Sequence, residues 1–185
     1  MIRYLVPLVL AAGLAGCGFH LRNQLTLPEG TPGVKVESSV RYSELAKLLE
    51  RGLVSAGAPL VHDGAPKGTK FARLAVRSER WGELPIAIDA QGRAQEYSLR
   101  YATVFAFYRD DGSVLVPEQV IELSRDYVSP PLDATGTSTE REILADELRR
   151  EMSASILRRI DSVVRAEQKA GRSAIEAVPA PDPQR

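Results

Sequence analysis

The chain has 185 residues, with 24 basic and 24 acidic side chains and 44% hydrophobic residues. This length fits a single domain, and the hydrophobic content is sufficient for one core. The balanced charge argues against nucleic acid as a partner, because nucleic-acid-binding domains are usually strongly basic. A single cysteine excludes a disulfide bond within the chain.

Residues 1–17 have the layout of an export signal. One basic residue, Arg3, is followed by an apolar run that ends at Leu14, and small residues then lead to Cys17. The run is shorter than the roughly 20 residues that a transmembrane helix requires, so we expect no lasting membrane span here. The sequence predicts that residues 1–16 form a signal peptide that is cleaved.

Cys17 is the predicted lipidation site, as an N-acyl and S-diacylglycerol cysteine. The tetrapeptide Leu14-Ala15-Gly16-Cys17 is a lipobox, in which the thiol receives a diacylglycerol before cleavage. A single acyl chain anchors a protein only marginally, whereas three chains on one cysteine hold it durably at a membrane. Gly18 stands in place of the aspartate that commonly retains lipoproteins in the inner membrane. We therefore expect an outer-membrane lipoprotein on the periplasmic side.

A linker rich in Pro and Gly, residues 17–33, precedes the predicted domain. Val34 and Val36 then alternate with polar neighbours, which is typical of a short strand. Over residues 41–56, apolar side chains recur at three- and four-residue spacing until Gly57 ends the run, so we expect an amphipathic helix.

Three further strands are predicted. In residues 71–81 apolar and polar side chains alternate, although not all in phase, and one face of the predicted strand is basic. The clearest strand places six side chains on one face: Tyr97, Leu99, Tyr101, Thr103, Phe105 and Phe107. The sequence Asp110-Asp111-Gly112 favours a tight hairpin turn, so residues 114–127 are expected to return antiparallel to that strand.

Residues 128–138 are predicted to form a loop, because Pro, Gly, Ser and Thr dominate them. Thr139 and Glu142 have the spacing of a capping box, so we expect the second helix to begin there and to carry an apolar stripe as far as Val164. The folded domain is then residues 34–166. The Pro-rich residues 167–185 contain few apolar side chains and are predicted to be a disordered tail.

The order strand, helix, three strands, helix predicts an α+β fold. Two amphipathic helices on one face of a four-stranded mixed sheet bury both apolar stripes at once, which gives a two-layer sandwich.

Residues for catalysis are scarce. His20 lies close to the predicted lipidated cysteine, and His62 lies in a turn-like stretch. Neither histidine belongs to a recognisable nucleophile, zinc or phosphate-binding motif. We therefore expect that the protein is not an enzyme and that it binds neither a metal ion nor a cofactor.

Four segments of the chain resemble the LptE family of lipopolysaccharide-assembly lipoproteins, and the resemblance covers nearly all of the mature chain. The most specific segment is the new N-terminus, Cys17-Gly18-Phe19-His20-Leu21-Arg22. The others are Gln95-Glu96-Tyr97-Ser98-Leu99-Arg100-Tyr101, Ser124-Arg125-Asp126-Tyr127 and Glu142-Ile143-Leu144-Ala145-Asp146-Glu147-Leu148-Arg149.

This resemblance implies a protein that plugs the large outer-membrane β-barrel LptD, assists its assembly and helps to place lipopolysaccharide in the outer leaflet. A scaffolding lipoprotein that stabilises a partner barrel without binding lipopolysaccharide is the alternative. A periplasmic lipid carrier is a third interpretation, and it would require a deep apolar cavity.

In some members of the family, basic side chains near the turn before the long strand and in the loop before the second helix are thought to touch the glycolipid. Here the loop of residues 133–138 has no basic residue, and the turn of residues 90–92 has only Arg93 just beyond it. The hypothesis from the sequence is a lipopolysaccharide-binding patch made of Arg73, Arg77, Arg80 and Arg93, because guanidinium groups bind phosphate oxygens in pairs. The competing interpretation is a solvated strand face whose arginines pair with Glu79 and Glu96.

Overall fold

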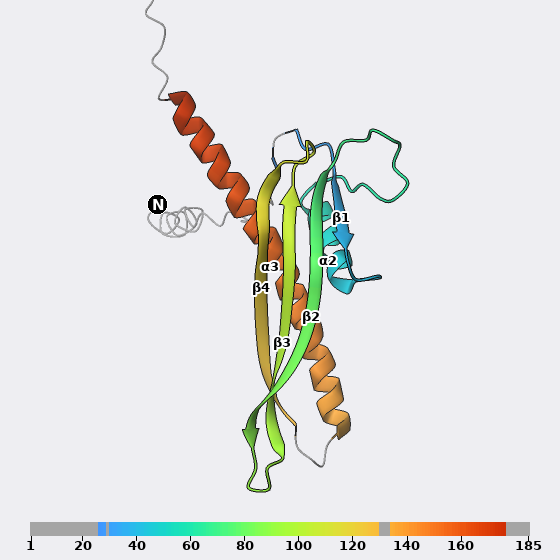
Figure 1. The fold of residues 1–185 in the computed structure, drawn as a ribbon, viewed down its shortest axis with the longest axis vertical. Helices are drawn as coiled ribbons and strands as arrows, with labels where there is room; N and C mark the ends of the chain where they lie inside the picture. Colours follow the sequence, from blue (N-terminus) through green and yellow to red (C-terminus); the bar gives the residue numbers. More distant parts are fainter. Residues whose placement is uncertain (1–25, 29, 130–133, 177–185) are drawn as a thin grey trace, which may run out of the picture.

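The computed structural model describes residues 26–28, 30–129 and 134–176, and the predicted signal peptide and Cys17 lie outside this range. Its elements follow the order β1, α2, β2, β3, β4, α3 (Figure 1). Their bounds are Val34–Ser38 for β1, Glu44–Ser55 for α2, Ala72–Ile88 for β2, Ala94–Tyr108 for β3, Val114–Val128 for β4 and Ala134–Glu176 for α3.

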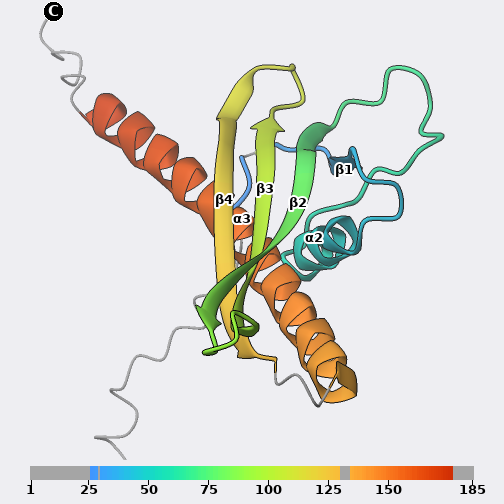
Figure 2. The same cartoon turned by 60° about the horizontal axis from the view of Figure 1, so that its bottom comes forward.

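The four strands form one mixed sheet in the order β1-β2-β3-β4. β1 is parallel to β2, with α2 in the connection between them, whereas β2, β3 and β4 form two antiparallel pairs. Both helices pack on one face of the sheet, and α3 crosses it diagonally (Figures 1 and 2). The predicted α+β two-layer sandwich is confirmed.

Helix α2 is shorter at its start than the predicted 41–56. Ser43 caps it, because its hydroxyl accepts a hydrogen bond from the amide of Ala46 at 3.0 Å. The chain leaves the helix through Gly57, whose φ of 82° is in the left-handed region that glycine tolerates. The apolar stripe buries Leu45, Leu49 and Leu53.

β2 is longer than the sequence predicted and contains a bulge. The predicted strand ended at residue 81, but β2 continues to Ile88 because it pairs with β3 along its whole length. Between Val76 and Ser78 the register shifts, which leaves Arg77 as an extra residue. Even-numbered side chains face the helices before the bulge, and odd-numbered ones face them after it.

The predicted hairpin between β3 and β4 is confirmed. The amide of Arg109 donates to the carbonyl of Ser113 at 2.8 Å, and Gly112 has a φ of 84°. Five of the six residues on the predicted apolar face of β3 are buried: Leu99, Tyr101, Thr103, Phe105 and Phe107 are all at most 1% exposed, whereas Tyr97 is half-buried.

The limits predicted for the second helix were wrong at both ends. α3 begins at Ala134, inside the predicted loop, although Thr137 and Ser138 are weak helix formers. Extension of an existing helix adds one hydrogen bond per residue, so a long packed helix carries such residues with it. At the other end α3 reaches Glu176, within the predicted disordered tail, and Glu167 there pairs with Arg109 at 2.5 Å.

The core lies between the sheet and the two helices. Side chains with 0% exposure from α3, namely Leu148, Met152, Ile156 and Ile160, pack against the inner face of β3 and against α2. Where the helices cross, a Cβ added to Gly52 would overlap Cδ1 of Leu157, so this glycine permits the close approach.

Two polar contacts tie further segments to this core. Glu79, on the inner face of β2, accepts hydrogen bonds from the hydroxyls of Ser43 at 2.5 Å and Tyr101 at 2.6 Å, which joins the cap of α2 to β2 and β3. At the N-terminal side, the amide of Thr26 donates to Oδ1 of Asp161 on α3 at 2.8 Å.

Candidate functional site

The outer face of the sheet, which points away from the helices, carries three of the four arginines singled out by the sequence. Arg73 lies before the bulge of β2 and Arg80 after it, and the register places both opposite outward residues of β3. Strict alternation would have put these two residues on opposite faces, and the extra residue Arg77 brings them to the same side.

Arg73 and Arg77 both contact Tyr108 of β3. The guanidinium of Arg73 lies 4.4 Å from the centre of the Tyr108 ring, and Arg77 donates a hydrogen bond to the Tyr108 hydroxyl at 3.2 Å. This hydrogen bond is the main reason why the pKa of Arg77 is raised. The two arginines are therefore held as a pair around one aromatic ring.

Acidic partners of these arginines differ from those expected. Arg73 meets Glu37 of the neighbouring β1 at 3.5 Å, and Arg77 reaches across β3 to Glu118 of β4 at 4.0 Å. Glu79 faces the core, so the expected pairing with the arginines through this residue was wrong. Arg80 has no carboxylate partner among the residues that the structure describes and is exposed to solvent.

Arg93 lies far from the other three, at the tip of the β2–β3 hairpin. β2 is 17 residues long, so at about 3.3 Å per residue the tip is roughly 50 Å from the start of the strand. Arg93 donates through Nε to Asp89 at 2.7 Å, and its amide donates to the other Asp89 oxygen at 2.8 Å. These bonds, the backbone one first, lower the pKa of Asp89. Arg93 thus closes the turn rather than joining the patch.

Arg100 on β3 is a basic residue of the outer face that lies outside the patch predicted from the sequence. It lies opposite Gly82 of β2 and pairs with Glu122 of β4 at 3.6 Å. Its place in the polar series of the long strand was visible in the sequence, but its neighbours on β2 were not. We refer to Arg73, Arg77, Arg80 and Arg100 as the arginine face.

The charges of the outer face are arranged in rows along the strands. The bases lie mainly on β2, small residues such as Ala102 and Ala106 fill much of β3, and acids lie on β4, namely Glu118, Glu122 and Asp126. Where β2 begins and the β3–β4 turn lies, a hollow of about 320 Å³ has charged side chains of both signs in its lining, namely Lys70, Arg73, Arg109, Glu37 and Asp110. An anionic ligand would meet positive charge along β2 and negative charge along β4.

The described part of the chain contains no group of three or more His, Cys, Asp or Glu residues that could hold a metal ion. Within the same range, no helix is both long and apolar enough to cross a membrane. Burial raises the pKa of Tyr101, the titratable side chain that lies deepest in the core, and its hydroxyl is already bonded to Glu79.

Comparisons with solved structures agree with this fold. Rare lipoprotein B from Shewanella oneidensis matches with a TM-score of 0.63 and 24% identity, over 74% of this chain and 98% of that one. Lipoprotein B from Nitrosomonas europaea matches with a TM-score of 0.66 and 20% identity, over 83% of this chain and 96% of that one.

Sequence comparisons identify the family. Two relatives, both named "LPS-assembly lipoprotein LptE", come from Photorhabdus laumondii and Yersinia pestis. The first is 28% identical over 85% of this chain and 84% of its own length, and the second is 30% identical over 84% and 73%. The model of the family described as "LptE: Lipopolysaccharide-assembly" matches residues 31–160. The chain therefore belongs to the LptE family of lipopolysaccharide-assembly lipoproteins.

Proposed function

We propose that this lipoprotein is anchored to the outer membrane through lipid on Cys17 and works on the periplasmic side as the plug and assembly partner of the LptD β-barrel. The complex inserts lipopolysaccharide into the outer leaflet. The role is one of binding, with no reaction catalysed. Membership of the LptE family is the observation that carries the proposal. The lipobox that ends at Cys17 supports the anchor.

The structure offers a physical basis for a plug. A fold whose inner sheet face is filled by its own helices presents its outer face, its strand edges and the long α3 to a surrounding wall. The core side chains between sheet and helices are closely packed, which is unfavourable for a carrier that would enclose a lipid.

The experiment is affinity purification of the full chain from outer membranes. Recovery of a large β-barrel protein in stoichiometric amount is the expected result, and recovery without one would contradict the proposal. Exchange of residues 1–17 for a signal peptide that is cleaved without lipidation should shift the protein from the membrane fraction to the soluble periplasm, because the acyl chains supply the anchoring free energy at about 0.8 kcal/mol per methylene.

The proposed lipopolysaccharide contacts are Arg73, Arg77 and Arg80 on the outer face of the sheet, together with Arg93 at the tip of the β2–β3 hairpin. Arg80 is the best placed of the four, since it is exposed and has no carboxylate partner among the described residues. Replacing all four by Gln should weaken lipopolysaccharide binding by about tenfold or more, because the loss of even one charged hydrogen bond costs about 1.5–3 kcal/mol. The matched control neutralises four bases elsewhere on the surface: Lys47, Arg51, Lys67 and Arg150.

A scaffolding role without lipopolysaccharide binding is the second candidate. The specific observation in its favour is that Arg73, Arg77 and Arg93 already have acidic partners, in Glu37, Glu118 and Asp89. Unchanged lipopolysaccharide affinity in the fourfold variant, with the barrel still recovered, would support this candidate over the first.

A further inference from the structure

β4 forms an edge of the sheet and has one strand neighbour, β3. Half of the backbone N–H and C=O groups of a strand point to each side, so β4 presents a row of these groups that no other described strand satisfies. Pro117 within β4 is typical of an edge position. This edge can accept another extended chain.

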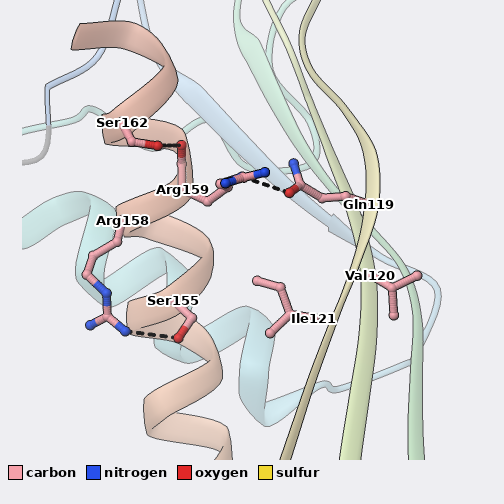
Figure 3. Close-up of a pocket in the computed structure, with 7 residues that line it drawn as sticks. All are labelled: Gln119, Val120, Ile121, Ser155, Arg158, Arg159 and Ser162. Atoms are coloured by element: carbon pink, nitrogen blue, oxygen red, sulfur yellow. Dashed lines mark hydrogen bonds between the residues drawn. The ribbon is translucent and has the colours of Figure 1, made fainter. Parts of the chain in front are cut away.

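A groove of about 420 Å³ lies between this edge and α3, and Figure 3 shows it from the side. Ile121 of β4 points toward the helix and Val120 points away from it. The remaining lining side chains are Gln119 from the strand and Ser155, Arg158, Arg159 and Ser162 from the helix. A strand added to β4 would place every second side chain in this groove.

Positive charge in the groove is uncompensated. Arg158 donates to the hydroxyl of Ser155 at 3.0 Å, and Arg159 donates to the side-chain carbonyl of Gln119 at 2.9 Å. Both arginines are exposed, and neither has a carboxylate partner within residues 26–28, 30–129 and 134–176. A guanidinium pair with only neutral partners favours an acidic ligand.

The ends of the same strand–helix seam differ from this middle region. Toward one end Arg125 of β4 pairs with Glu151 of α3, and toward the other Arg109 pairs with Glu167 of α3, each at 2.5 Å. The helix therefore supplies acids at both ends, where the sheet supplies bases. In the middle the helix supplies the bases, and the strand offers a neutral glutamine.

Charge on the outer side of the edge restricts the occupant further. β4 carries Glu118, Glu122 and Asp126 on the outer face of the sheet. Two copies of this chain paired through β4 would bring these acids together and the arginines together, which is unfavourable on both faces. A second copy is therefore a poor occupant.

We propose that the β4 edge binds an extended segment of another protein chain by strand addition. The bound segment carries acidic side chains at alternate positions, which meet Arg158 and Arg159, and basic or neutral side chains at the intervening positions, which meet the acids of the outer face. Main-chain hydrogen bonds supply affinity, and the alternating charges fix which face of the segment turns inward. This surface is separate from the arginine face.

The test measures binding of a fluorescent peptide to the full-length lipoprotein in detergent. The probe alternates Glu and Lys between flanking Thr and Val residues, so its net charge is small and non-specific attraction is weak. The control peptide has the same composition with its Glu and Lys residues in separate blocks. We expect the alternating peptide to bind at least tenfold more tightly than the control peptide.

Protein variants locate the site. Charge reversal by Arg158→Glu with Arg159→Glu should reduce affinity for the alternating peptide by at least tenfold. The matched control, Arg51→Glu with Arg150→Glu, makes the same charge change on exposed helix residues outside the groove and should leave binding unchanged. Equal binding by both peptides, or equal effects of both double variants, would overturn the proposal.

Hydrogen exchange provides the readout that separates strand addition from simple charge attraction. Added peptide should slow amide exchange within residues 118–123 of β4. Binding without this protection, protection confined to other strands, or self-association through β4 in place of peptide binding would each contradict the inference.

Discussion

The carboxylate of Glu79 gives a stability prediction that can be worked out from the structure. Tyr101 is 0% exposed, and its hydroxyl donates to Glu79 at 2.6 Å, a length typical of a bond to a charged acceptor. Such bonds contribute about 1.5–3 kcal/mol to stability. Tyr101→Phe should therefore destabilise the protein by about that amount, which corresponds to a fall in Tm of about 6–12 °C for a domain of this size.

The pairwise contribution follows from a double-mutant cycle of Tyr101→Phe with Glu79→Gln. We expect a coupling free energy of about 1.5 kcal/mol, because each single change removes the same charged hydrogen bond. Urea unfolding should be followed by circular dichroism, since Trp81 stacks on Tyr101 at 4.0 Å and its fluorescence would change with the mutation itself. Tyr42→Phe, at a residue that is 79% exposed, is the matched control. A coupling energy below about 0.5 kcal/mol would refute the reasoning.

Three further predictions concern other parts of the fold. Hydrogen bonds lower the pKa of Asp89 below its ordinary 3.8. The ionised carboxylate therefore stabilises the hairpin tip above pH 3.8, and this stabilisation is lost as the pH falls through the lower pKa of the folded state. Asp89→Asn at neutral pH should reproduce the acid-induced changes in the NMR amide shifts of the hairpin tip. Gly52→Val should cost about 1–3 kcal/mol through overlap with Leu157, and Leu157→Ala in the same chain should recover part of this loss in urea unfolding. Ile156→Ala should cost about 2–5 kcal/mol by calorimetry, whereas Ile143→Ala, 54% exposed on the same helix, should cost less than about 1 kcal/mol.

The fold was predictable where periodicity is undisturbed. β3 alternates strictly, and its buried face was read correctly from Leu99 to Phe107. β2 was harder to interpret because its alternation changes phase at Arg77, and a bulge of one residue leaves no mark in composition. The same bulge decides that Arg73 and Arg80 share a face, so the arginine face is only partly visible in the sequence.

Contacts between distant segments account for the remaining differences. The C-terminal part of α3 has few apolar residues, and nothing near Glu167 in the sequence indicates its partner Arg109. Likewise the sequence indicated a surface position for Glu79, because Ser43 and Tyr101, which donate hydrogen bonds to its carboxylate, are distant from it in the sequence. The groove beside β4 depends on which helix face lies against which strand edge, and only the folded structure gives this.

The hydrogen bond between Thr26 and Asp161 limits how far the folded domain can lie from the proposed lipid anchor at Cys17. Thr26 is nine positions after Cys17, and an extended chain reaches at most about 3.3–3.6 Å per residue, or roughly 30 Å in total. With lipid on Cys17, the middle of α3 would stay within that distance of the bilayer. A connection this short gives an effective concentration in about the millimolar range for partners in the same membrane. Contacts too weak to hold two freely diffusing proteins together would therefore be sufficient to bind this lipoprotein to a partner in the same membrane.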